Sequence, residues 1–149
     1  MYENLYQMGT IFGLKFVPQD RLSNSHSAIL LGEYIHFHHP EQENGYHDEV
    51  FKAYFSEGKD IGQLEILSDI LEKLGIDPIV IPTALNDIIC QTRMQENAQT
   101  AVANGVTSTP TFFIGNERVV GAQPYPRLLT AARRALGLEA TDPNDLAIL

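Results

Sequence analysis

The sequence predicts a mainly α-helical protein with one small β-hairpin, an α+β fold. Apolar residues recur at spacings of three and four through most of the 149 residues, the period of amphipathic helices. Near the C-terminus two short β-branched and aromatic runs replace that pattern, Thr111–Ile114 and Arg118–Val120. Turn residues beginning at Gly115 separate these runs, which is typical of a hairpin with a tight turn.

The first half of the chain is expected to be helical with short connectors. Asn and Ser side chains accept first-turn N–H groups, and a proline ends the helix that precedes it. The expected elements are, in order, a helix tail at Tyr2–Ile11, a connector at Gly13–Arg21, a helix from Ser23 or Asn24 to about His38 before Pro40, a polar loop at Glu41–Gly45 and a short helix at Tyr46–Phe55.

The second half continues with two helices before the hairpin and one after it. Gly75 and Gly105 stand where a left-handed residue ends a helix. The apolar stripe of the long helix, which includes Leu85, Ile88 and Ile89, is strongest in its first half. The expected elements are helices at Gln63–Leu74, about Thr83–Ala103 and Pro124 or Tyr125 to Leu136, then a loose tail at Glu139–Leu149.

Composition excludes several classes of partner. The net charge of −9 argues against nonspecific binding to nucleic acid or to anionic lipid. No apolar run approaches the roughly 20 residues of a membrane span, and the N-terminus lacks the pattern of a signal peptide. One cysteine, Cys90, allows no internal disulfide, so a cytoplasmic location is expected.

Three phrases around the hairpin carry a family resemblance: Gly105-Val106, Thr109-Pro110-Thr111-Phe112 and Gly121-Ala122-Gln123. Their order resembles the DsbA-type thioredoxin family, in particular its FrnE-like dithiol-disulfide isomerase branch. Phe51–Gly62 and Leu74–Pro78 resemble phrases of the family's helical insertion. The resemblance implies the C-terminal half of a thioredoxin-like fold plus that insertion, as one truncated domain over residues 1–138, with the insertion and long helix at 23–104 and the hairpin and final helix at 105–138.

The resemblance also implies a substrate-binding position. It makes the Thr109–Pro110 bond cis, with Phe112 entering the core and the Thr109 backbone open to hydrogen-bond an extended peptide. The family's Cys-x-x-Cys is absent, and the chain is expected to start inside a family member, after the first strand, the dithiol helix and the second strand. No catalytic residue is therefore expected here.

Other reactive side chains have structural interpretations. Cys90 follows two isoleucines and is expected to be a buried structural thiol. Among the clustered histidines only His36 and His39 have helical ligand spacing, and no metal site is expected. No phosphate loop or dinucleotide motif indicates a cofactor, and the carboxylates Glu41 and Glu43 suggest no acid/base pair. The last helix carries cations expected to lie at the surface: Arg127, Arg133 and Arg134.

Three functions follow as hypotheses. The first is a DsbA/FrnE-family protein, by family a dithiol-disulfide oxidoreductase or isomerase, that is inactive alone because disulfide exchange needs a second thiol. The second is a noncatalytic module that binds extended peptides or protein thiol substrates and forms homo-oligomers through its open sheet edge. The third is a relative of 2-hydroxychromene-2-carboxylate isomerases and kappa-class glutathione transferases, which binding of glutathione would distinguish.

Overall fold

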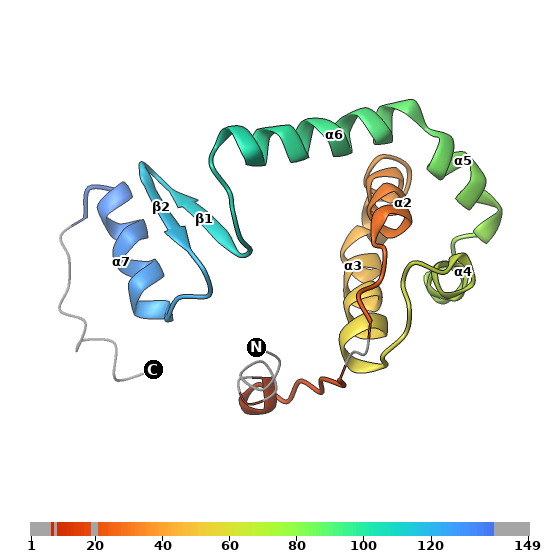
Figure 1. Cartoon of the computed structure of the whole chain (residues 1–149), viewed down its shortest axis with the longest axis horizontal. Helices are drawn as coiled ribbons and strands as arrows, with labels where there is room; N and C mark the ends of the chain where they lie inside the picture. The colour runs from red at the N-terminus through yellow and green to blue at the C-terminus, as the bar shows by residue number, and fades with distance from the viewer. Residues whose placement is uncertain (1–6, 8, 19–20, 139–149) are drawn as a thin grey trace. The chain divides into compact units, whose positions relative to one another are not determined.

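A computed structural model describes residues 7, 9–18 and 21–138. The chain divides into two compact units, residues 1–97 and 98–149, and each is described by itself (Figure 1). Helices form the first unit and the second contains the hairpin, which confirms the α+β class. The expected tail at Glu139–Leu149 and most of the helix expected at Tyr2–Ile11 lie outside the described residues.

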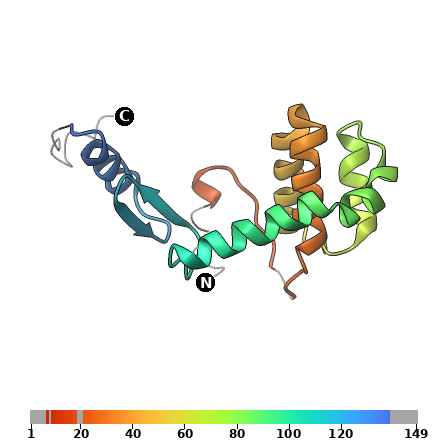
Figure 2. The ribbon, with the colours of Figure 1, turned by 90° about the horizontal axis from the view of Figure 1, so that it is seen from above.

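The first unit is built on two helices that lie side by side, α2 and α3 (Figures 1 and 2). Its elements are α2 (His26–His38), a 3₁₀ turn η1 (Pro40–Gln42), α3 (Glu43–Phe51), a π-helical segment η2 (Lys52–Ser56), α4 (Leu64–Lys73), a second 3₁₀ turn η3 (Pro78–Val80), α5 (Ile81–Asn86) and the first part of α6 (Ile88–Ala103). Its core is one cluster that includes Leu31, Ile35, Tyr46, Tyr54, Leu67, Ile70, Leu71 and Ile81.

Local sequence explains the ends of α2 and α4. The Asn24 side chain accepts the His26 N–H at 3.0 Å, but the N-cap position of α2 is Ser25, one residue after the two expected caps, and Ser25 makes no side-chain cap bond. After α4, Gly75 adopts φ +73° and its N–H donates to the Glu72 carbonyl. The next N–H, of the buried Ile76, reaches back to the Leu71 carbonyl, so the glycine ends this helix as expected.

The polar loop expected at Glu41–Gly45 is wrong, because α3 begins at Glu43. A glutamate in the first turn favours the positive end of a helix. Gly45 lies in α3 close to Leu74, which follows α4; a Cβ at Gly45 would lie 3.1 Å from Leu74 Cδ2. The helix expected to end at Phe55 passes into the π-helical segment η2 after Phe51.

The single helix expected at Thr83–Ala103 is also wrong. This segment forms two helices, α5 and α6, which are separated by one extended residue, Asp87, at φ −71° and ψ 114°. Asp87 Oδ1 accepts the N–H groups of Ile89 (2.8 Å) and Cys90 (3.1 Å) and so starts a new helix. The expected apolar stripe does not bury Ile88 and Ile89, which are exposed within the first unit, whereas Cys90 is buried.

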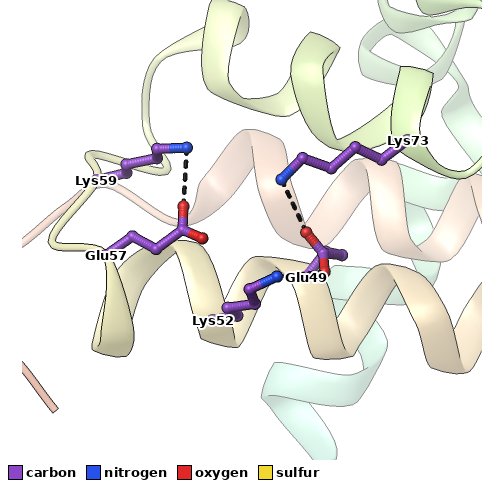
Figure 3. Close-up of polar contacts among 5 residues, drawn as sticks. All are labelled: Glu49, Lys52, Glu57, Lys59 and Lys73. Carbon is purple, nitrogen blue, oxygen red and sulfur yellow. Dashed lines mark hydrogen bonds and ion pairs between the residues drawn. The ribbon is translucent and has the colours of Figure 1, made fainter. Parts of the chain in front are cut away.

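Ion pairs connect α3 and α4 at the surface (Figure 3). Glu49 of α3 accepts from Lys73 of α4 at 2.9 Å and from Lys52 at 3.1 Å. Lys59 and Glu57 form a second pair at 2.8 Å in the loop that follows η2. The lysines lower the pKa values of both glutamates through hydrogen bonds, with Lys73 the largest contributor at Glu49.

The second unit places a hairpin against one helix, α7 (Tyr125–Ala135). Strands β1 (Thr111–Ile114) and β2 (Glu117–Val120) pair antiparallel, with Thr111 opposite Val120 and Phe112 opposite Val119. Val119 is buried, but Phe112 remains 37% exposed, so the expectation that Phe112 enters the core is wrong. The smaller Val119 and Ala131 of α7 occupy the interior of this unit.

Candidate functional site

Thr109 and Pro110 lie in the connection between α6 and β1, and both are exposed within the second unit. The peptide bond between them is cis, the geometry that the sequence predicts. Among the described residues, no hydrogen bond uses the Thr109 backbone, whereas the Pro110 carbonyl accepts the Gly121 N–H at 2.8 Å. The site is therefore a strand entrance with free backbone groups immediately before it.

The bond from Gly121 to Pro110 fixes which way the β1 backbone points. Opposed residues of an antiparallel pair alternate between hydrogen-bonded and non-hydrogen-bonded positions. Because Pro110 and Gly121 form a bonded position, Phe112 bonds to β2, while the N–H and C=O groups of Thr111 and Phe113 point away from β2. We call the free backbone of Thr109, Thr111 and Phe113 the open edge.

The side chains beside the open edge are partly apolar. Phe113 is 53% exposed and Val120 is 43% exposed, and both lie on the hairpin face that Val119 and Phe112 do not occupy. An exposed aromatic ring next to unpaired backbone groups is suited to contact an added strand. Sequence patterns alone did not indicate the roles of Thr111 and Phe113, because the bonded register is needed to orient them.

The environment of the Cys90 thiol does not favour a nucleophilic role. The residue is 1% exposed at the start of α6. Burial raises the pKa of its thiol, and the neighbouring Asp87 carboxylate raises it further. Because the thiolate is the reactive form, the thiol is suited to packing rather than to disulfide exchange.

A groove of about 400 Å³ lies in the first unit between α2 and α3. Gly32 and Ala28 supply part of its floor, and the His36 ring contacts the Glu43 carboxylate at 3.0 Å on its lining. Sequence spacing singled out His36 and His39, whereas in the structure the polar partner of His36 is Glu43. Among the described residues, no group of three His, Cys, Asp or Glu side chains is placed to hold a metal ion.

Two cations of α7 have partners on the hairpin that the sequence does not reveal. Arg127 pairs closely with Glu117 of β2, and Arg134 approaches the same carboxylate at 3.9 Å. Arg127 lowers the pKa of Glu117 mainly through its hydrogen bond. These contacts join α7 to the turn end of the hairpin and not to the open edge.

No helix of the described residues is long and apolar enough to cross a membrane.

Several helices followed along the chain by a hairpin that packs against one helix are the arrangement expected of a thioredoxin-like protein of the DsbA type. The DSBA-like thioredoxin domain matches residues 1–133, and the chain therefore belongs to this family. The single cysteine is consistent with the absence of the Cys-x-x-Cys motif from the chain.

One curated relative matches part of the sequence, and two solved structures share the fold. The chain is 31% identical to the uncharacterized protein YwbO of Bacillus subtilis (strain 168) over 90 residues, which are 58% of the chain and 45% of YwbO. A structure described as a candidate protein disulfide isomerase from Nitrosomonas europaea is similar at a TM-score of 0.68 and 18% identity, covering 91% of this chain and 70% of the other. A 2-hydroxychromene-2-carboxylate isomerase is similar at a TM-score of 0.67 and 24% identity, covering 91% and 64%.

The identity and coverage of each match determine what that match shows about this chain. At 18% and 24% identity, the two solved structures show the fold alone. The region matched to YwbO spans less than half of that relative's length. The activities named for the solved structures therefore enter only as hypotheses for this chain.

Proposed function

We propose that this chain binds extended polypeptides by adding a strand to the open edge, and that it catalyses no dithiol–disulfide exchange by itself. The observation that carries the proposal is the outward-pointing backbone of β1, which the unbonded backbone of Thr109 extends just before the strand. Strand addition obtains affinity from main-chain hydrogen bonds, and the open edge supplies donors and acceptors at alternate residues. A protein thiol substrate in an extended conformation is the expected class of ligand.

The chemistry of disulfide exchange supports the second half of the proposal. Oxidation of a substrate needs an attacking thiolate and a second thiol that resolves the mixed disulfide. The chain offers one thiol, Cys90, which is buried and has a raised pKa. A reducing compartment such as the cytoplasm suits a chain with one unpaired thiol, and this location is part of the proposal.

The open edge also suits a second copy of the chain. Two β1 strands have the same unpaired backbone groups, so antiparallel pairing of the strands would join two hairpins into one sheet. Peptide and second copy would then compete for one surface. We propose self-association as a concentration-dependent alternative to peptide binding.

A small-molecule isomerase is the second candidate function. The groove between α2 and α3 favours it, because about 400 Å³ lies within the usual range for small-molecule sites. His36 and Glu43 provide a titratable pair on its lining, 3.0 Å apart. Binding of glutathione or of an aromatic carboxylate in this groove would support this function instead.

Peptides with blocked amides test the proposed binding mode. Fluorescence anisotropy compares a labelled, proline-free decapeptide with the same peptide N-methylated at alternate residues, in both alternate patterns. N-methylation removes the backbone donors of one peptide edge and retains the side chains. We expect binding by the parent peptide, at least tenfold weaker binding by one methylated pattern, and near-parent binding by the other. Equal affinity for all three peptides, or no binding by the parent, would refute strand addition.

A further inference from the structure

We propose that Arg118 is a positioning residue for the open edge, acting through the turn that ends α6. This inference rests on the proposed function. Arg118 Nη1 donates a hydrogen bond to the Gly105 carbonyl at 2.8 Å, across a separation of 13 residues. In the hairpin register Arg118 stands opposite Phe113, so it lies on the same face as that exposed ring. The bond thus connects β2 to the segment that leads into β1.

The α6 end has a defined geometry at the bonded carbonyl. Gly105 adopts φ +67°, its N–H donates to the Val102 carbonyl, and the Val106 N–H donates to the Ala101 carbonyl, both at 2.9 Å. These bonds form a glycine cap that turns the chain out of the helix. Arg118 supplies a charged donor to the carbonyl of the capping residue, and such bonds are stronger than neutral ones.

The backbone conformation at position 105 favours glycine, which adopts φ +67°. A positive φ is costly for a residue with a Cβ, by roughly 1–2 kcal/mol. A Cβ at Gly105 would lie 2.7 Å from Arg118 Nη1, the end of a flexible side chain, which shows how closely the guanidinium approaches this residue.

Further bonds fix the other end of the same segment. Thr111 Oγ1 donates to the Ser108 carbonyl at 2.6 Å, and the Gly121 N–H donates to the Pro110 carbonyl at 2.8 Å. Thr109 lies between these fixed points with its backbone free. Among the described contacts, the Arg118 bond joins the α6 side of this segment to the hairpin. Its loss would leave the segment to be ordered by the incoming peptide, which weakens binding.

Three variants test this role in the full chain. Arg118→Met removes the donor and keeps an unbranched apolar side chain, while Arg118→Lys retains a charged donor. Arg134→Met is the matched control, because Arg134 is an exposed arginine of the same unit whose contact is a 3.9 Å ion pair. Each is assayed for peptide anisotropy and for exchange of the Val106 amide hydrogen, whose bond belongs to the glycine cap.

We expect Arg118→Met to bind the parent decapeptide about tenfold more weakly, with a similar acceleration of Val106 exchange. Arg118→Lys should recover most of both losses, and Arg134→Met should match the unmodified chain. Unchanged binding in Arg118→Met, unchanged exchange, or equal losses in both Arg118 variants would overturn the positioning role. Absence of peptide binding by the unmodified chain would instead refute the proposed function, and the exchange rates alone would then decide the role of Arg118.

Discussion

Replacing Tyr46 by phenylalanine should destabilise the first unit at neutral pH and stabilise it at high pH. Tyr46 is 1% exposed, and its hydroxyl donates to the Ala28 carbonyl of α2 at 2.8 Å. Removing this buried donor costs about 1 kcal/mol at pH 7, the usual net contribution of one such hydrogen bond. The ring remains, so the larger cost of a cavity does not arise.

The same burial makes the effect depend on pH. Burial raises the pKa of Tyr46 well above its ordinary value, which is about 10 in the unfolded chain. The folded protein therefore keeps the proton that the unfolded chain releases above pH 10. Stability from this group is fully present below pH 10 and declines above it by about 1.4 kcal/mol per pH unit. The phenylalanine variant lacks this decline, so the two proteins should become about equally stable near pH 11.

Urea unfolding followed by far-ultraviolet circular dichroism measures this difference at pH 7, 9, 10 and 11. Tyr125→Phe is the control, because Tyr125 is 67% exposed and has no hydroxyl bond among the described contacts. This control should follow the unmodified chain at every pH. A Tyr46→Phe deficit that stays constant from pH 7 to pH 11 would refute the assigned burial of the hydroxyl, as would the absence of any deficit at pH 7.

Four further outcomes follow from the structure. Cys90 should resist iodoacetamide in the native chain and react in urea; equal rates would contradict its burial and raised pKa. Asp87→Ala should speed exchange of the Ile89 amide roughly fivefold, while Asp87→Asn retains most protection; unchanged exchange would argue against the cap. Refolding of a scrambled disulfide substrate should proceed at the uncatalysed rate with this chain, and clear acceleration would exclude the proposed inactivity. Light scattering should show self-association at concentrations of about tens of micromolar, and Phe113→Lys should reduce this association. A monomer at every concentration tested would count against pairing at the open edge.

The sequence predicted the elements whose signals are local. Gly75 and Gly105 end helices with positive φ, as their positions indicated, and the two strands begin at Thr111 and end at Val120. The strand entrance at Thr109–Pro110 was predicted from the family resemblance, because an isolated X-Pro bond is far more often trans. These features need no knowledge of distant neighbours.

The errors occurred where a second signal competed with the apolar period. Asp87 is an effective N-cap, but the apolar residues on both sides of it suggested one continuous helix. The family resemblance placed Phe112 in the core after the strand entrance, whereas Val119 and Ala131 are the buried residues of this unit. The bond from Arg118 to Gly105 spans 13 residues, so no local pattern could reveal it.

Backbone chemical shifts during a peptide titration test the central claim most directly. The labelled decapeptide is added to the isotope-labelled chain, and the amide signals of both units are followed. Strand addition predicts saturable shifts at Thr109, Thr111 and Phe113, with the Thr111 and Phe113 amides becoming protected from exchange. Shifts confined to the groove residues of α2 and α3, with those three amides unchanged, would contradict the account.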